Sequence, residues 1–197
     1  MTYAKTGVKY VHHEAEKFDV GVYFEANGHG TILFDPALLD QLRRLEATKH
    51  PRDPPRAALA VERLNAVAAL ANQAVGDALA DALLVEAILC VTRTTVQAWD
   101  ALYDDLPSRQ LKQKVESRAA LKPNANETRL LAPPDLQAAI DALAAKTTQG
   151  RAFVRPSGTE DVVRIYAEAQ TQALADALAA DCARAVFDLA GGLGDRP

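Results

Sequence analysis

The sequence is poor in cysteine, with only Cys90 and Cys182 among its 197 residues. No Cys-x-x-Cys motif is present, which argues against a zinc ribbon and against a dithiol redox site. Both cysteines lie in alanine- and valine-rich stretches that predict helices. We therefore expect two buried free thiols in a protein of a reducing compartment.

Long apolar runs and an excess of positive charge are also missing. No segment approaches the roughly 18 uninterrupted apolar residues of a membrane helix, so no membrane partner is expected. Residues 1–10 are polar, contain two lysines and do not resemble a secretory signal peptide, which favours a cytoplasmic location. With a net charge of −4 the chain offers no general surface for nucleic acid, so any anion must be held by a local cluster of donors.

The composition is otherwise that of a globular protein, with 49% hydrophobic and 24% charged residues. Residues 18–24 alternate and are rich in strand formers, residues 27–30 (Asn-Gly-His-Gly) predict a turn, and residues 31–34 predict a second strand. This hairpin lacks obvious sheet partners, and two strands alone are marginally stable in water. Helices are expected over about 36–45, 56–74 and 78–90, with an exposed loop over 49–55.

The second half predicts a small antiparallel sheet with helices on one face, an α+β arrangement. We place the boundary between residues 95 and 96, which divides the chain into parts 1–95 and 96–197. The expected elements follow the order helix, strand, helix, strand, strand, helix, over about 96–106, 110–117, 134–143, 151–155, 162–168 and 171–189.

A cluster of phosphate-binding residue types lies between the last two predicted strands. Residues 155–160 read Arg-Pro-Ser-Gly-Thr-Glu, and Arg164 follows on the next strand. A hairpin brings Arg155 and Arg164 back toward each other, so both guanidinium groups can reach one phosphate. Ser157 and Thr159 add hydroxyls, and Gly158 adds accessible backbone amides. Together with Pro156, which stiffens the entry, these residues predict an anion site with the donors that a phosphate requires.

Two other interpretations of this loop compete with the anion site. The arginines could pair with Glu160 and Asp161 in an ordinary surface hairpin. Ser157 could be a nucleophile, but no Gly-x-Ser-x-Gly surrounds it and no histidine follows it in the chain.

Glu25 and Asn27 form a second candidate site at the tip of the first hairpin. In extended geometry they point the same way, and a carboxylate with an amide matches the vicinal hydroxyls of a sugar. A plain polar turn explains them equally well. His29 is close enough to assist, without an assigned role in proton transfer. His12 and His13 are adjacent and diverge on either a strand or a helix, so we expect a solvated segment there rather than a metal site.

Six segments carry a resemblance to known proteins: residues 5–10, 21–31, 72–78, 99–103, 155–164 and 191–197. One of them contains the form Glu-Ala-Asn-Gly-His-Gly over 25–30. On these segments, and over nearly the whole chain, the sequence resembles the phosphoacetylglucosamine mutase family of the α-D-phosphohexomutase superfamily. The Glu-Ala-Asn-Gly-His-Gly form is specific to the acetylglucosamine branch.

The resemblance implies a four-domain enzyme that interconverts N-acetylglucosamine 6-phosphate and 1-phosphate for UDP-N-acetylglucosamine synthesis. An active-site phosphoserine, Mg²⁺ and a hexose bisphosphate activator belong to that implied mechanism. The sugar hydroxyls would be held by Glu25, Ala26 and Asn27. The phosphate that does not react would be held by Arg155, Pro156, Ser157, Gly158, Thr159 and Arg164.

Two motifs of the family are absent from this sequence. Neither the phosphoserine loop, usually Thr-Ala-Ser-His-Asn, nor the metal-binding Asp-x-Asp-x-Asp occurs. The chain therefore resembles the C-terminal part of a mutase, the later portion of an incomplete domain three plus domain four, with the N-terminal domains as implied partners. Two alternatives stay open: an inert part of an enzyme, or a stand-alone, non-catalytic phosphosugar-binding module. A degenerate structural fragment is disfavoured because the anion-binding residues are retained.

Overall fold

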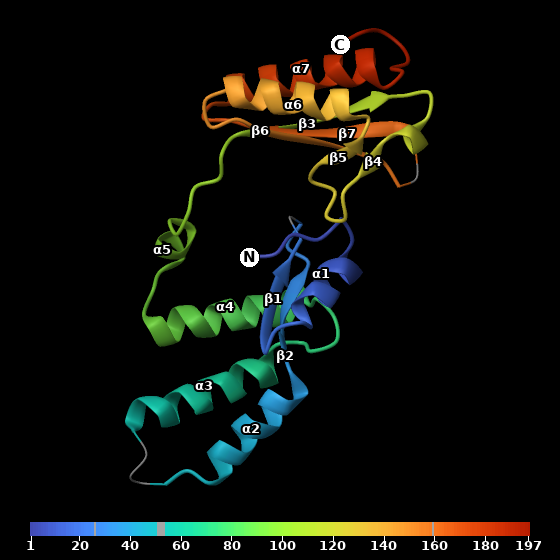
Figure 1. Cartoon of the computed structure of the whole chain (residues 1–197). Coiled ribbons are helices and arrows are strands. Elements are labelled where there is room, and N and C mark those ends of the chain that lie inside the picture. The colour runs from blue at the N-terminus through green and yellow to red at the C-terminus, as the bar shows by residue number, and fades with distance from the viewer. Residues whose placement is uncertain (26, 51–53, 159) are drawn as a thin grey trace. The chain divides into compact units, whose positions relative to one another are not determined.

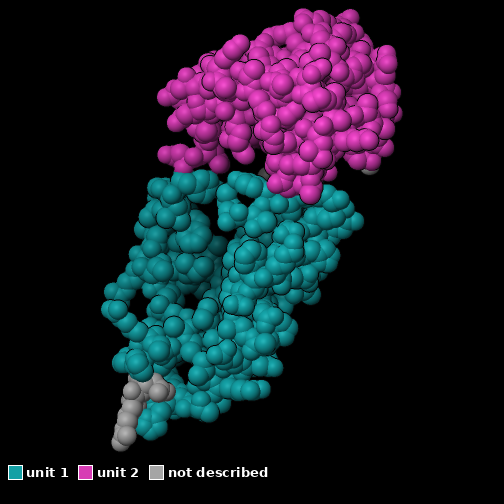
Figure 2. Space-filling view, viewed as in Figure 1, with its two compact units in different colours: residues 1–103 teal, residues 104–197 magenta. Residues whose placement is uncertain are grey.

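The computed structural model describes residues 1–25, 27–50, 54–158 and 160–197. They divide into two compact units, Met1–Tyr103 and Asp104–Pro197 (Figure 1, Figure 2). The division follows Tyr103, and the boundary between residues 95 and 96 stays a prediction. Within the described part of the chain, no helix is both long and apolar enough to cross a membrane.

The first unit opens with a helix, α1 (Val8–Ala15), that packs against a hairpin of β1 (Val20–Phe24) and β2 (Gly30–Phe34). The two strands are antiparallel, with Val20 opposite Phe34 and Phe24 opposite Gly30. Among the described residues they form a sheet of two strands, as the sequence predicts. Ala15, Tyr23 and Leu33 form a small core, and Val8 and Val11 pack against it.

Helix α1 was not predicted, although the segment with His12 and His13 was expected to be solvated; the His13 side chain is 69% exposed as expected, whereas that of His12 is only 21% exposed. The segment forms a helix because Val8, Val11 and Ala15 recur at helical spacing and bury one face against the hairpin. His12 is held by this packing, with its Nδ1 3.1 Å from the hydroxyl of Tyr23.

Four further helices complete the described part of the first unit: α2 (Pro36–Ala47), α3 (Pro55–Leu70), α4 (Ala78–Thr92) and α5 (Val96–Asp100). The start of α2 was predicted from Asp35 and Pro36, and this is confirmed. The Asp35 carboxylate accepts hydrogen bonds from the amides of Ala37 and Leu38 at 2.8 and 3.3 Å. Part of the loop expected over 49–55, residues 51–53, lies outside the described residues.

The second unit contains the antiparallel sheet that the sequence predicts, with β7 (Val162–Glu168) between β3 (Ser108–Lys114) and β6 (Arg151–Pro156). Helices α6 (Pro134–Lys146) and α7 (Gln172–Leu189) cover one face of this sheet (Figure 1). The expected α+β class is therefore confirmed. A short helix, η1 (Arg118–Ala120), and a two-stranded ribbon of β4 (Lys122–Pro123) and β5 (Leu130–Ala132) were not predicted.

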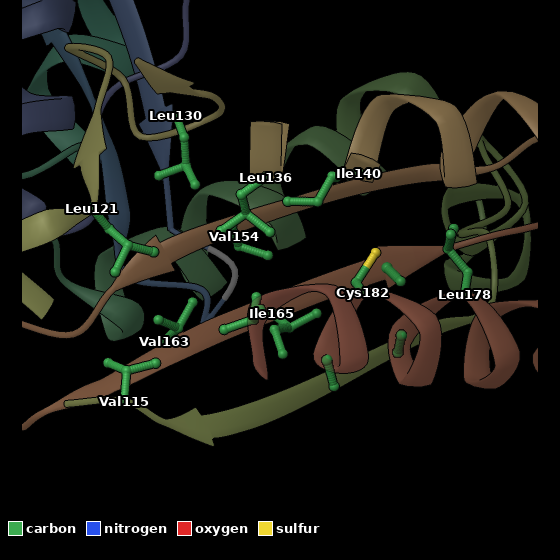
Figure 3. Packing of buried hydrophobic residues seen from close by; sticks show 14 residues of the cluster. Val115, Leu121, Leu130, Leu136, Ile140, Val154, Val163, Ile165, Leu178 and Cys182 are labelled. Atoms are coloured by element: carbon green, nitrogen blue, oxygen red, sulfur yellow. The ribbon is translucent and has the colours of Figure 1, made fainter. Parts of the chain in front are cut away.

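The core of the second unit lies between the sheet and the two helices, as Figure 3 shows. This core includes Val154 of β6, Ile165 of β7, and Leu136 and Ile140 of α6, and all four side chains are almost fully buried. Helix α7 contributes a face whose buried members are Ala175, Leu178, Ala179, Cys182, Ala183 and Val186.

The two cysteines differ in their surroundings. Cys182 is completely buried, as expected, and burial raises the pKa of its thiol to about 12. Cys90 is exposed, so the expectation of a buried thiol there is wrong. The error arises because α4 is apolar around much of its circumference, and the sequence does not indicate which of its sides is covered.

Candidate functional site

The candidate phosphate site lies on the face of the β3-β7-β6 sheet that α6 and α7 do not cover. Along β7, Val163, Ile165 and Ala167 are buried against the helices, so Arg164 and Tyr166 point to the opposite, open face. This alternation follows from the pleat of the strand. It separates the apolar side of the sheet from a side that carries charged and aromatic residues.

Three cations lie in one row across the open face. The strand register places Arg164 of β7 directly opposite Arg155 of β6 on one side and Lys112 of β3 on the other. Directly opposed residues have Cβ atoms roughly 4.5–5.5 Å apart, so their side chains can reach one ligand. We call Lys112, Arg164 and Arg155 the cationic row. The predicted approach of Arg155 and Arg164 is confirmed, whereas their binding of phosphate stays a prediction.

In the part of the chain that the structure describes, Arg155 and Arg164 do not pair with Glu160 or Asp161, as the alternative interpretation required. Glu160 lies 3.9 Å from the ammonium group of Lys112, and Asp161 lies 3.7 Å from Arg118. Among the described residues Arg164 has no carboxylate partner, and its side chain is exposed. Arg164 is therefore the member of the row that is most available to an added anion.

The loop that follows β6 begins beside the cationic row. Ser157 is buried, and its amide donates to the carbonyl oxygen of Val162 at 2.9 Å, which closes the hairpin. Gly158 is exposed, and no atom lies within 4 Å of the position that a Cβ would occupy there. A ligand can therefore approach the backbone at Gly158 closely. Thr159 lies outside the described residues, so its predicted hydroxyl contact stays a prediction.

Arg118, on η1, ties the two ends of this loop together. Its Nη1 donates to the carbonyl oxygen of Ser157 at 2.7 Å and to that of Glu160 at 3.4 Å. Its Nε lies 3.7 Å from the carboxylate of Asp161. The sequence analysis missed this residue, because no local pattern links an arginine after β3 to a loop some forty residues later.

Glu127 is a second residue that the sequence analysis missed. It lies between β4 and β5, and its Oε2 accepts a hydrogen bond from Nη1 of Arg155 at 3.3 Å. Both side chains are about three-quarters buried, with 26% and 24% of their surface exposed. The cationic row therefore has a carboxylate near each end, Glu127 beside Arg155 and Glu160 beside Lys112.

The predicted sugar-binding loop in the first unit is a closed turn. Strand β1 ends at Phe24, and the amide of Gly28 donates to the carbonyl oxygen of Glu25 at 2.9 Å. The extended geometry expected between Glu25 and Asn27 is therefore wrong. Asn27 accepts the amide of His29 on its Oδ1 at 2.9 Å, which leaves its Nδ2 as a donor. Ala26 lies outside the described residues, so its contribution stays a prediction.

Glycines at positions 76 and 30 leave the space that His29 and the backbone of Tyr23 occupy beside this turn. A Cβ on Gly76 would lie only 2.3 Å from Cδ2 of His29, and a Cβ on Gly30 would lie 2.2 Å from the carbonyl oxygen of Tyr23. A pocket of about 460 Å³ opens here, with His12, Tyr23, His29 and Gly76 in its wall. Burial is the main cause that raises the pKa of Tyr23, and the charges of Asp81 and Glu25 raise it further.

Two family models together match most of the chain. The model of phosphoacetylglucosamine mutase AMG1, domain III, matches residues 1–94. The model of the phosphoglucomutase/phosphomannomutase C-terminal domain matches residues 110–185. The second range contains the whole cationic row, and the first contains the turn at Glu25 and Asn27.

Named relatives agree with these models. A phosphoacetylglucosamine mutase of Sus scrofa is 53% identical over 98% of this chain, and one of Arabidopsis thaliana is 49% identical over 97%. The chain belongs to the phosphoacetylglucosamine mutase family. It spans about a third of the length of these family members, 35% in both cases.

Solved structures of the family share the fold. The crystal structure of Aspergillus fumigatus N-acetylphosphoglucosamine mutase in complex with GlcNAc-6P and magnesium has a TM-score of 0.84 and 48% identity. The match covers 95% of this chain and 34% of the Aspergillus chain. A substrate complex of N-acetylglucosamine-phosphate mutase gives a TM-score of 0.82 at 41% identity, over 93% of this chain and 33% of the other.

Magnesium accompanies the Aspergillus family member in its complex with GlcNAc-6P. Among the described residues, no group of three or more histidine, cysteine, aspartate or glutamate side chains could hold a metal ion. The Asp-x-Asp-x-Asp motif is likewise absent from the sequence. The described residues therefore do not fit a magnesium site.

Proposed function

We propose that this chain supplies the sugar-binding and phosphate-binding parts of a phosphoacetylglucosamine mutase. The reaction is the interconversion of N-acetylglucosamine 6-phosphate and 1-phosphate, for UDP-N-acetylglucosamine synthesis in the cytoplasm. The names of the relatives and the GlcNAc-6P complex of the Aspergillus protein support this proposal. A glucose 1,6-bisphosphate complex of the same protein supports a hexose bisphosphate as activator.

The pairing of Arg155 with Arg164 on the open face carries the proposal. Two opposed guanidinium groups present parallel N–H donors, and these match the oxygens of a phosphate dianion. The accessible backbone at Gly158 adds room for close approach. Such a grip recognises phosphate oxygens and little else. It therefore suits a bisphosphate intermediate that presents each of its two phosphates in turn.

Glu25 and Asn27 are the proposed contacts to the sugar. The Glu25 carboxylate accepts hydrogen bonds from hydroxyls, and the free Nδ2 of Asn27 donates one. Because Oδ1 of the Asn27 side chain accepts the amide of His29, the orientation of this side-chain amide is fixed before a ligand arrives. Ala26 completes the proposed segment. These residues would select the sugar, while the cationic row would anchor its phosphate.

Substitution of Arg164 tests the proposed grip. Arg164→Ala should weaken binding of N-acetylglucosamine 6-phosphate by roughly 1.5–3 kcal/mol, because a charge-assisted contact is lost. Isothermal titration calorimetry on the purified chain measures the change. Arg109→Ala is the matched control, since Arg109 also lies on the sheet but pairs with Asp176 of α7 at 2.6 Å. Equal affinity in the wild type and Arg164→Ala would rule out the grip.

A non-catalytic phosphosugar-binding module is the second candidate function. The observation that favours it is the presence of the anion-binding residues in a sequence without the phosphoserine motif. Both candidates require the same binding surface, so the calorimetry supports either. They differ in whether the chain takes part in turnover.

A further inference from the structure

We propose that Glu127 is a built-in counter-charge that weakens the grip of the cationic row on phosphate and so allows its release. This inference rests on the proposed function, because it assumes that phosphate binds at Arg155 and Arg164. It adds a residue that tunes the affinity of the site. Glu127 is not part of the cationic row, and it lies outside the Arg-Pro-Ser-Gly-Thr-Glu loop of residues 155–160.

Glu127 lies beside the guanidinium group of Arg155. Its Oε2 lies 3.3 Å from Nη1 of Arg155, so any phosphate held by the same guanidinium lies within a few ångströms of a carboxylate. Both side chains are largely shielded from water, which strengthens the interaction relative to an exposed ion pair. One contact leaves the other donors of Arg155 available, because a guanidinium carries five N–H groups. Glu127 therefore remains near the ligand instead of being excluded by it.

The backbone at Glu127 has a conformation that glutamate rarely adopts. Its φ of 57° lies in the left-handed region, where glycine or asparagine is the less strained choice. A turn that served only to connect β4 and β5 would have no need of a glutamate at this position. Strain of this kind is retained where the side chain has a task.

A rigid frame holds the carboxylate in place. The Asn124 carbonyl oxygen accepts the amide of Glu127 at 3.1 Å, and Oδ1 of Asn124 accepts the amides of Thr128 and Arg129 at 3.0 and 3.2 Å. The base of the turn is fixed to α6, where Arg129 contacts Asp141 at 2.6 and 3.2 Å. These bonds fix the turn, so the carboxylate is presented to Arg155 from a defined position.

The consequence for binding follows from the charges of the row. Lys112 faces Glu160 and Arg155 faces Glu127, which leaves Arg164 as the member without a carboxylate among the described residues. Three uncompensated cations would hold a phosphate dianion tightly. A site that must grip two phosphates in succession needs fast release as much as binding. A fixed carboxylate at the end of the row lowers affinity without removing any donor.

A purely structural role for Glu127 predicts the opposite sign. If the carboxylate only orders Arg155, its removal loosens the guanidinium and weakens phosphate binding. If it acts as a counter-charge, removal strengthens binding because repulsion between like charges is lost. Glu127→Gln separates the two, since glutamine keeps an oxygen that can accept the hydrogen bond of Arg155 but carries no charge.

The test is a titration of the ¹⁵N-labelled chain with inorganic phosphate and with N-acetylglucosamine 6-phosphate, followed at the amides of Ser157 and Gly158. We expect the dissociation constant of Glu127→Gln to be roughly three- to tenfold lower than that of the wild type. Glu127→Gly, which also relieves the left-handed φ, should bind more tightly than the wild type and carries the test if the glutamine variant fails to fold. Asp135→Asn on α6, an exposed position on the covered side of the sheet, is the control for a change of one unit in net charge.

Each outcome decides the question. An unchanged or higher dissociation constant in a folded charge-free variant, with binding in the wild type, overturns the counter-charge and leaves the proposed function intact. Binding by Glu127→Gln with none by the wild type supports it in its strongest form. No binding by any variant overturns both the counter-charge and the proposed grip.

Discussion

Among single residues, the two cysteines show how burial alone gives identical groups different chemistry. Cys182 lies in the core of the second unit between α7 and the sheet, where desolvation of the thiolate is the main cause of its raised pKa of about 12. Cys90 lies on an exposed side of α4. Because the thiolate is the nucleophile, the buried thiol is inert at neutral pH and the exposed one is accessible to reagents.

Thiol labelling therefore distinguishes the two positions. In the native chain at neutral pH we expect one thiol to react with Ellman's reagent, and two after denaturation. Cys90→Ser should abolish the native reaction and leave the denatured count at one. Rapid labelling of Cys182 in the folded Cys90→Ser variant would show that α7 is not packed against the sheet as described.

At the scale of elements, α7 has the largest part in the core of the second unit, and its first turn depends on a cap. The hydroxyl of Thr171 accepts the amide of Leu174 at 3.3 Å and so satisfies one of the free donors at the start of the helix. The helix then buries six residues against the sheet and α6. Its end at Leu189 lies close to the sheet as well, because Val115 forms a bridge with Gly192.

Removal of this cap should weaken the second unit. Thr171→Ala is expected to lower the free energy of unfolding by about 1 kcal/mol, the usual effect of losing an N-cap. Urea unfolding followed by circular dichroism measures the change, and native-state hydrogen exchange locates it in the first turn of α7. Thr171→Ser keeps the hydroxyl and should behave like the wild type. A similar loss in both variants would show that the methyl group, not the hydrogen bond, matters.

The elements also show what a sequence can predict and what it cannot. Strands β6 and β7 were predictable because strand formers flank a Ser-Gly-Thr turn, and their register then brings Arg155 and Arg164 together. Helix α1 was not, because its stability comes from packing on the hairpin.

Short or distant features carry still less signal. Strands β4 and β5 have two and three residues, too few for any periodicity. Arg118 and Glu127 reach the site through contacts with residues 39 and 28 positions away. No local pattern encodes such contacts, so the supporting residues of the candidate site could be found only in the structure.

At the scale of the whole molecule, the two candidate binding segments belong to different units. The turn at Glu25 and Asn27 belongs to the first unit, and the cationic row belongs to the second. Each set alone offers few contacts to a sugar phosphate. Neither unit contains the phosphoserine motif of the family. The proposed function therefore assigns binding, and not phosphoryl transfer, to the residues of this chain.

Turnover measurements test this division. The purified chain, supplied with N-acetylglucosamine 6-phosphate, magnesium and glucose 1,6-bisphosphate, should form no 1-phosphate, because the phosphoserine motif of the family does not occur in its sequence. Addition of the N-terminal two-thirds of the Sus scrofa relative should restore turnover if the chain is part of an enzyme. Binding without restored turnover would favour the non-catalytic module. Genuine turnover by the chain alone would refute the interpretation of the absent motifs.

The pairing of Arg155 with Arg164 has a further consequence for the sheet itself. Like charges that face each other across neighbouring strands repel, and the contact with Glu127 offsets this repulsion only at Arg155. Under the proposed function, a phosphate dianion held by both arginines would replace the repulsion with attraction and would link β6 to β7. The stability of the second unit would then rise with the phosphate concentration.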